Sequence, residues 1–277
     1  MRSCFRCLPL LLLGCVTAGD PSPQTAPSTP NLLPRSAGVL SESDVVLVLD
    51  QSTPGLLASG LDVDGDGVVG RTHTWVTEKN PFSRPPSSWT SDPGDTVRAL
   101  QMQVTRALVP RLAARGDRLG LLAFAQRAKQ HRRTLTRHVD RPMIATPVGG
   151  PEAVLTALDE IPPPQARRRF DLARALKIAE SLLGAVPDSE PDRPRAILLL
   201  SLGRPSAPDG IHWASQRALQ TARRLGDRGI QVWAIPFGGA DIRYLNDLTG
   251  GTGGRVVPLE QLTQLLAAAR LQDPPAG

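Results

Sequence analysis

The stretch that decides the fold is Val45-Val46-Leu47-Val48-Leu49-Asp50-Gln51-Ser52. Its first five residues are valine or leucine, and they end abruptly at a carboxylate and two further polar side chains. A short, continuous apolar run of this kind is typical of a strand buried on both faces of a sheet. The carboxyl end of such a strand is the edge at which open parallel sheets bind their ligands.

Similar runs recur further along the chain, at 119–124, 196–200 and 230–237. Apolar side chains at helical spacing lie between or after them, at 97–108 (with Asp95 as the expected N-cap), 172–183, 214–225 and 259–266. This alternation predicts an α/β, Rossmann-like sheet that is mostly parallel, with helices on both faces. The polar stretch 128–135 is expected to form an edge strand, where charge discourages edge-to-edge association.

Composition excludes some classes of function. The 277 residues are 40% hydrophobic and only 4% aromatic, and the net charge of +6 comes from arginines spread along the chain. Without interleaved aromatic residues for base stacking, we expect no nucleic-acid partner. The glycines at 250–254 follow a helical segment and precede a strand, which is the reverse of the order in a phosphate-binding loop.

The first forty residues are predicted to lie outside the folded domain. Arg2 and Arg6 precede a short apolar run at 8–13, which is typical of a secretory signal comprising residues 1–14. Leu-Leu-Gly-Cys at 12–15 resembles a bacterial lipobox, which implies that Cys15 is lipidated and anchors an exported protein in the cell envelope. An ordinary signal peptide with a chance cysteine is the alternative. Residues 15–40 are then a flexible tether rich in Pro, Ser and Thr.

The order of these features resembles the von Willebrand factor type A domain. The resemblance covers residues 41–272, leaves 273–277 as a tail, and rests on four short motifs. They are Asp50-Gln51-Ser52, the strand 118–124, Phe170-Asp171-Leu172 at a helix start, and the glycine-rich turn 249–255. The resemblance implies one antiparallel edge strand and a protein or peptide ligand at the carboxyl ends of the strands.

That family holds a divalent ion at the same edge, in a metal-ion-dependent adhesion site with the pattern Asp-x-Ser-x-Ser plus a Thr and an Asp from later loops. Asp50 and Ser52 match this pattern, but Pro54, Phe170 and Leu202 stand where the second Ser, the Thr and the Asp are expected. The resemblance therefore implies a degenerate site. We do not expect Mg²⁺ there, because one carboxylate and one hydroxyl make a poor octahedral shell.

The remnant of this site comprises Asp50, Ser52, Asp171 and Arg169. Three arginines, 167–169, precede Phe170. One hypothesis is that a guanidinium takes the place of the ion, pairs with Asp50 and receives an acidic group of the partner. The alternative is a solvated loop without contact to Asp50.

An insertion at 55–93 contains Asp62-Val63-Asp64-Gly65-Asp66-Gly67-Val68, which resembles the first half of an EF-hand loop. The resemblance implies Ca²⁺ bound by Asp62, Asp64, Asp66 and the backbone carbonyl of Val68. Position twelve is His73 rather than Glu, so Glu78, Asp92 or Asp95 is expected to fold back and complete the shell. A metal-free Asp-Gly turn is the alternative.

No catalytic arrangement stands out, since the sequence has neither Gly-x-Ser-x-Gly nor His-Glu-x-x-His. We therefore predict a non-catalytic adhesion or scaffold module of the cell envelope, with oligomeric state open. The alternative is a metal-assisted hydrolase that uses the acidic loop.

Overall fold

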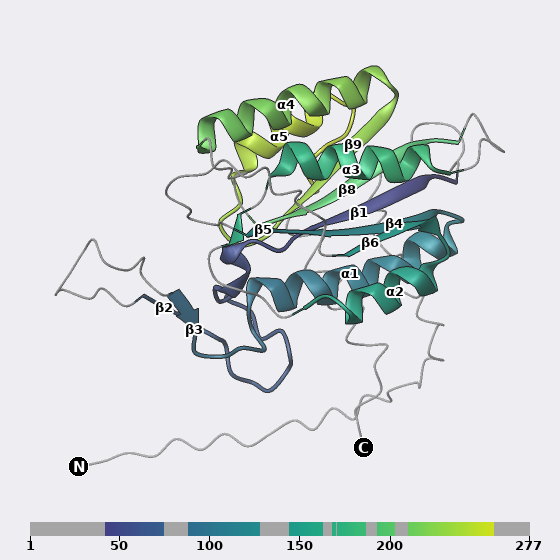
Figure 1. Ribbon diagram of the computed structural model, residues 1–277. Coiled ribbons are helices and arrows are strands. Elements are labelled where there is room, and N and C mark those ends of the chain that lie inside the picture. Colours follow the sequence, from purple (N-terminus) through teal and green to yellow (C-terminus); the bar gives the residue numbers. More distant parts are fainter. Residues whose placement is uncertain are drawn as a thin grey trace, which may run out of the picture.

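A five-stranded sheet forms the centre of the computed structural model, which describes residues 42–74, 88–127, 144–162, 168–169, 171–186, 193–202 and 210–257 (Figure 1). In spatial order the strands are β6 (Ile144–Gly149), β4 (Arg118–Phe124), β1 (Asp44–Asp50), β8 (Arg195–Ser201) and β9 (Ile230–Pro236). β1 pairs in parallel with both β4 and β8, β8 pairs in parallel with β9, and β6 is antiparallel to β4. The predicted fold class, mostly parallel with one antiparallel edge strand, is confirmed.

Helices cover both faces of the sheet (Figure 1). One face carries α1 (Val97–Ala114) and α2 (Pro151–Asp159), and the other carries α3 (Leu172–Gly184), α4 (Ile211–Asp227) and α5 (Ile242–Gly250). Val45, Leu47 and Leu49 of β1 belong to the core on the α1 side, whereas Val46 and Val48 belong to the core on the α3 side. Successive side chains of a strand point to opposite faces, so this one run supplies both cores.

Short elements complete the chain. They are a 3₁₀ turn η1 (Thr53–Leu56), the antiparallel pair β2 (Thr72–Thr74) and β3 (Ser88–Thr90), and the antiparallel pair β5 (Gln126–Arg127) and β7 (Arg168–Arg169). η1, β2 and β3 all fall between β1 and α1, in the region of the expected insertion. In the part of the chain that the structure describes, no helix is long and apolar enough to cross a membrane.

One detail of the sequence prediction is wrong, the N-cap of α1. The strand that pairs antiparallel with β4 is residues 144–149, and the expected edge strand at 128–135 lies outside the described residues. α1 is capped by Thr96 rather than Asp95, because the Thr96 hydroxyl accepts from the Ala99 N–H at 3.0 Å. The expected signal, Cys15, the tether, the helix at 259–266 and the tail also lie outside the described residues.

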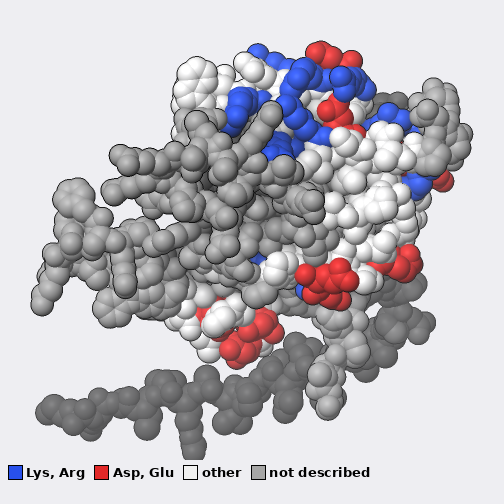
Figure 2. Space-filling view, viewed as in Figure 1, with Lys and Arg blue, Asp and Glu red and all other residues white. Residues whose placement is uncertain are grey.

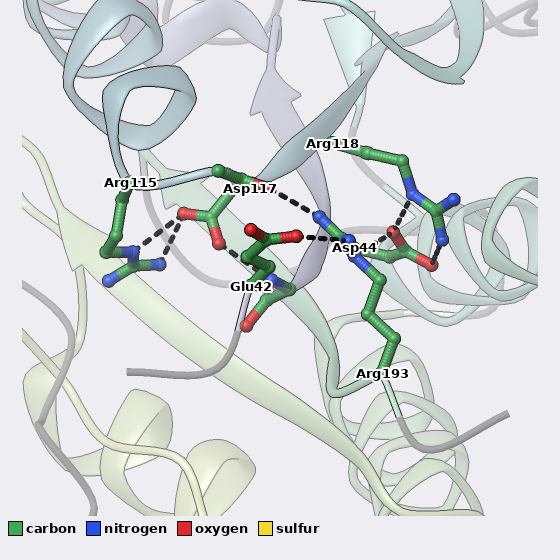
Figure 3. A network of polar contacts seen from close by, with 8 residues as sticks. Glu42, Asp44, Arg115, Asp117, Arg118 and Arg193 are labelled. Atoms are coloured by element: carbon green, nitrogen blue, oxygen red, sulfur yellow. Dashed lines mark hydrogen bonds and ion pairs between the residues drawn. The ribbon is translucent and has the colours of Figure 1, made fainter. Parts of the chain in front are cut away.

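Ion pairs close the edge of the sheet where the strands begin (Figure 3). Arg118 donates to both oxygens of the buried Asp44, at 2.7 and 2.9 Å, and Arg193 lies 3.1 Å from the same carboxylate. Arg193 also pairs with Glu42 at 2.9 Å. The start of β1 is therefore tied to the starts of β4 and β8, its two parallel neighbours.

A second pair lies beside it, between Arg115 and Asp117 in the turn before β4. The Arg115 guanidinium contacts Asp117 Oδ2 at 2.5 and 2.8 Å, and the Ser43 N–H donates to Oδ1 at 2.9 Å. Burial raises the pKa of Asp117, and the charge of Arg115 offsets part of that rise.

Candidate functional site

Asp50 lies at the carboxyl end of β1, but its carboxylate points inward. Its side chain is 1% exposed, and it accepts backbone N–H bonds from Ser52 at 2.9 Å and from Leu202 at 3.1 Å. Burial raises the pKa of Asp50 to about 6, and the hydrogen bonds from Ser52 and Leu202 limit the rise. The carboxylate therefore holds two loops together at the rim of the sheet.

Leu202 closes the rim from the β8 side. Its side chain is buried, and its Cδ1 lies 3.1 Å from the position that a Cβ on Gly55 would occupy. Cβ of Arg98 lies 3.3 Å from the same position on the other side. Both oxygens of Asp50 already accept backbone N–H bonds, and the residue that follows β8 here is the apolar Leu202, so Asp50 and Leu202 offer no set of free oxygen ligands that fits Mg²⁺.

The buried side-chain amides of Gln51 and Gln101 form a hydrogen-bond network that reaches the backbone carbonyl of Asp50. Gln51 donates to the Gln101 side chain at 2.7 Å, and Gln101 donates to the backbone carbonyls of Asp50 and Leu200 at 3.2 and 2.9 Å. Arg98 donates to Gln51 Oε1 at 2.7 Å and to the carbonyls of Ile161 and Pro162, just after α2. The guanidinium that braces this rim therefore comes from α1.

The other members of the predicted remnant are more scattered. Ser52 is buried and precedes η1, and its N–H is one of the donors to Asp50. Asp171 caps α3, accepts from the Arg174 N–H at 3.2 Å and lies 3.8 Å from Arg217. The backbone of Arg169 pairs with Gln126 in the β5–β7 ladder. The side chains of Arg168 and Arg169, and all of Arg167 and Phe170, lie outside the described residues, so the hypothesis of an arginine paired with Asp50 stays a prediction.

The acidic loop has a turn structure built from its own carboxylates. Asp62 accepts from the N–H groups of Gly65 and Gly67 at 2.6 and 3.3 Å, and Asp66 accepts from Val68 at 2.7 Å. Gly65 and Gly67 have φ angles of +84° and +86°, which glycine adopts at little cost. The alternation of Asp and Gly thus folds the loop tightly around its carboxylates.

The segment Asp92-Pro93-Gly94-Asp95 folds back onto this loop. Asp95 is fully buried and accepts from the N–H groups of Val63 and Gly70 at 2.5 and 2.6 Å. A Cβ on Gly94 would lie 1.9 Å from Oδ2 of Asp64, so only glycine lets this carboxylate approach. Asp95 therefore connects the loop to the start of α1.

Carboxylate oxygens converge as a result. Oxygens of Asp62, Asp64 and Asp95 lie within 4.8 Å of one another, and so do those of Asp64, Asp66 and Asp92. Oxygen ligands 2.3–2.6 Å from a Ca²⁺ ion sit at most about 5 Å apart, so this donor set fits a hard cation. Of the predicted ligands, the five aspartates fall into these two groups, which share Asp64, whereas Glu78 and the side chain of His73 lie outside the described residues. Val68 directly follows the acidic turn, and its side chain is exposed.

Sequence reasoning missed Gln101 and Arg98. Gln101 is fully buried on the apolar face of α1, at the position three residues before Val104. A polar residue within a helical apolar stripe was the available signal, because buried amides need hydrogen-bond partners. Arg98 carried no signal, since a surface arginine in a first helical turn is common.

Comparison with known proteins supports the fold. No family model and no curated protein matches the sequence. The von Willebrand factor type A domain of SpRpn10 superimposes with a TM-score of 0.50 at 10% identity, covering 84% of this chain and 96% of that one. BatB from Bacteroides thetaiotaomicron superimposes with a TM-score of 0.47 at 14% identity, and the match covers 83% of this chain and 100% of that one. Proximal thread matrix protein 1 of the mussel byssus gives 0.46 and 12%, and the match spans 83% of this chain but only 45% of that protein.

Proposed function

We propose that this chain, whose fold is that of a von Willebrand factor type A domain, is a non-catalytic protein-binding module of the bacterial cell envelope, acting in adhesion or as a scaffold. One observation carries the proposal: a closed rim at Asp50 lies beside an exposed acidic loop. Both oxygens of Asp50 accept backbone N–H bonds and the side chain is buried. A partner that binds at the rim would therefore contact its surface, because the Asp50 carboxylate is not accessible to react with a substrate.

The finer proposal for the insertion is that it binds Ca²⁺. Asp62, Asp64, Asp66 and Asp92, with the Val68 carbonyl, would hold the ion, and Glu78 is a further candidate ligand. Asp95 accepts two backbone N–H bonds, and one of its oxygens lies within 4.8 Å of oxygens of Asp62 and Asp64. The bound ion supplies positive charge that offsets the repulsion between neighbouring carboxylates and so orders the loop.

A metal-assisted hydrolase would need a base or nucleophile beside the ion. Among the described side chains, the groups that converge on the loop are five aspartates, and each of them accepts a backbone N–H bond from the loop or from the segment 92–95. The side chain of His73 and the whole of Glu78 lie outside the described residues. The arrangement supports a structural ion better than a catalytic one.

We also propose that the protein is exported and held on the membrane through Cys15. The support is the Leu-Leu-Gly-Cys motif after a short apolar run. Labelling cells with a radioactive fatty acid checks this, with Cys15→Ser as the matched variant. Label on the Cys15→Ser protein would contradict the assignment.

Calorimetry on the full chain tests the calcium site. We expect a dissociation constant of about 0.1–1 mM, the range of extracellular modules, together with a rise in melting temperature on adding Ca²⁺. Asp64→Asn should abolish both, and Asp159→Asn, on an exposed α2 carboxylate, should leave both unchanged. Absence of both heat and thermal shift in the wild type removes the calcium proposal.

Envelope extracts test the binding role separately. The full chain should retain one or more envelope proteins, and the amount retained should fall when Ca²⁺ is chelated. Turnover of phosphoesters or peptides that disappears in Asp64→Asn would instead favour the hydrolase.

A further inference from the structure

Large apolar side chains that are exposed form two groups within the described residues. The first, here called the loop patch, is Leu61, Val68 and Val69 in the acidic loop, which are 44%, 56% and 48% exposed. The second, here called the helix patch, is Ile211 and Trp213 at the start of α4 and Ile242 at the start of α5, which are 55%, 63% and 47% exposed. Together they account for every large hydrophobic residue that is exposed in the described part of the chain.

The members of the helix patch lie at one end of the molecule. β8 and β9 are adjacent and parallel, and the helices that follow them both begin beyond the carboxyl ends of these strands (Figure 1). α4 and α5 also contact each other. The first turns of both helices therefore present Ile211, Trp213 and Ile242 on the edge of the sheet to which Asp50 also belongs.

The two patches sit in surroundings of opposite charge. The loop patch is interspersed with Asp62, Asp64 and Asp66, with Asp92 beside them. Near the helix patch, Arg217 lies one turn beyond Trp213 on α4, and Arg243 follows Ile242 on α5, with Asp241 just before Ile242. Figure 2 shows basic side chains gathered over α4 with acidic ones among them, and acidic side chains on the insertion and over α2.

One copy of the chain cannot bring its own patches together. The insertion lies with α1 on one side of the central sheet, and α4 and α5 cover the other side (Figure 1). Asp95 and the amide hydrogen bonds it accepts hold the loop against the start of α1. A second copy has no such constraint, and it offers both an apolar surface and the opposite charge.

We propose that the acidic loop of one copy docks on the helix patch of a second copy, so that the chain associates head to tail. Val68 and Val69 would pack against Trp213 and Ile211, and the loop aspartates would face Arg217 and Arg243. The five aspartates exceed the charge of one divalent ion, so a calcium-loaded loop still attracts arginine. Such a contact is heterologous and leaves a free loop and a free helix patch at the two ends.

A membrane surface is the other occupant that the helix patch suggests, since tryptophan and arginine also suit anionic lipid. Lipid would account for the helix patch alone, because apolar side chains set among carboxylates do not suit an anionic surface. Self-association accounts for both patches. This inference rests on the proposed binding function and names a second copy as the partner.

Sedimentation velocity of the full chain in Ca²⁺ tests the proposal. We expect association that rises with protein concentration and weakens as salt is raised. Trp213→Asp and Val68→Arg should each weaken association by at least about tenfold, as loss of a central apolar contact does at protein interfaces. Gln220→Asp, an exposed change on α4 outside the patch, is the matched control and should leave association unchanged.

Mixing the two variants gives the decisive readout. Trp213→Asp keeps an intact loop and Val68→Arg keeps an intact helix patch, so together they should form a dimer that grows no further. Circular dichroism and melting temperature show that each variant is folded, which is expected because both side chains are exposed.

Three results would overturn the proposal: a monomer at all concentrations, association that neither variant weakens, or a mixture that fails to dimerise. Binding of monomers to phosphatidylglycerol vesicles that depends on Trp213 would assign the helix patch to lipid instead. A monomeric chain that still retains envelope proteins would end this inference and leave the proposed function standing. Failure of the calcium titration would remove only the proposed calcium site and would leave this inference to the sedimentation experiment.

Discussion

The backbone N–H of Leu202 lies 3.1 Å from Oδ2 of Asp50, although 152 residues separate the two in the chain. This bond joins the end of β8 to the end of β1, and the Leu202 side chain fills the space beside it. The loops after two adjacent parallel strands are thereby fixed to one another. The hydrogen bonds of Asp50 therefore fix the rim of the sheet at the carboxyl ends of β1 and β8.

The raised pKa of Asp50 predicts that stability falls between pH 4 and pH 6 because of this group. Its pKa rises from 3.8 to about 6 on folding, so in this window the folded state holds a proton that the unfolded state has lost. The free energy of unfolding then decreases as pH rises, by about 3 kcal/mol in total. Denaturant unfolding from pH 4 to pH 7 measures it, with Asp50→Asn as the variant that cannot titrate.

Asp50→Asn should be less stable than the wild type at pH 4. The side-chain NH₂ group of the asparagine would point at the backbone N–H of Ser52 or of Leu202, and two donors cannot form a hydrogen bond. The difference should shrink, or reverse, by pH 7. A gap between the two proteins that is constant with pH would contradict a titrating Asp50.

Gly94→Ala should damage the acidic loop without unfolding the domain. The new Cβ would lie 1.9 Å from Oδ2 of Asp64, so that carboxylate must move away. Displacing a carboxylate that ligates a metal costs affinity, and we expect Ca²⁺ binding to weaken about 10–100-fold. Calorimetry measures the change, and Gly184→Ala, where a Cβ meets open space at the end of α3, is the control. Equal affinity in the two variants would show that Asp64 is not a ligand.

Asp95→Asn should destabilise the insertion more than a change at an exposed aspartate. Each Asp95 oxygen accepts a short backbone bond, and one of the donors, Val63, is buried in the core on the α1 side. The asparagine amide would place a donor against one of these N–H groups. We expect a loss of about 2–3 kcal/mol in the free energy of unfolding. Asp66→Asn, which is exposed, should cost less than about 1 kcal/mol in the absence of Ca²⁺.

Asp44→Ala should be among the most destabilising single changes at the base of the sheet. Asp44 is 2% exposed and contacts two arginines, so its removal leaves buried positive charge without a partner. Breaking a buried pair in this way costs about 3–5 kcal/mol. Asp159→Ala, which breaks the exposed pair with Arg106, should cost at most about 1 kcal/mol. Urea unfolding compares the two, and similar losses would contradict the network in Figure 3.

Local patterns were enough to predict the four parallel strands and the helices α1, α3 and α4, but neither β6 nor α2. Val45–Leu49 alternate between two cores, and a run without polar residues is needed when both faces are covered. The cap of α1 was missed because Asp95 and Thr96 are both good N-cap residues. Only the tertiary contacts of Asp95 with Val63 and Gly70 decide between them.

The rim could be predicted only in part. The mismatches at Pro54 and Leu202 predicted a broken metal pattern, and the structure shows Leu202 buried near Gly55 with its backbone N–H bonded to Asp50. The inward direction of Asp50 depends on a donor 152 residues away, which no local pattern reveals. The approach of Asp92 and Asp95 to the loop aspartates, in two groups of three, was predicted because the loop motif is local and Asp92-Pro93-Gly94-Asp95 lies close behind it in the chain.

The ion pairs at the start of β1 have a mechanical consequence. A tether at Cys15 would pull on the chain just before Glu42, along the axis of the central strand. That strand has neighbours on both sides, and its first residue is bridged to each of them by an arginine. Tension therefore loads both hydrogen-bonded ladders and the bridging charges simultaneously, in shear, instead of peeling one bond after another. A domain held in this way should stay folded under forces that would unzip a terminal edge strand.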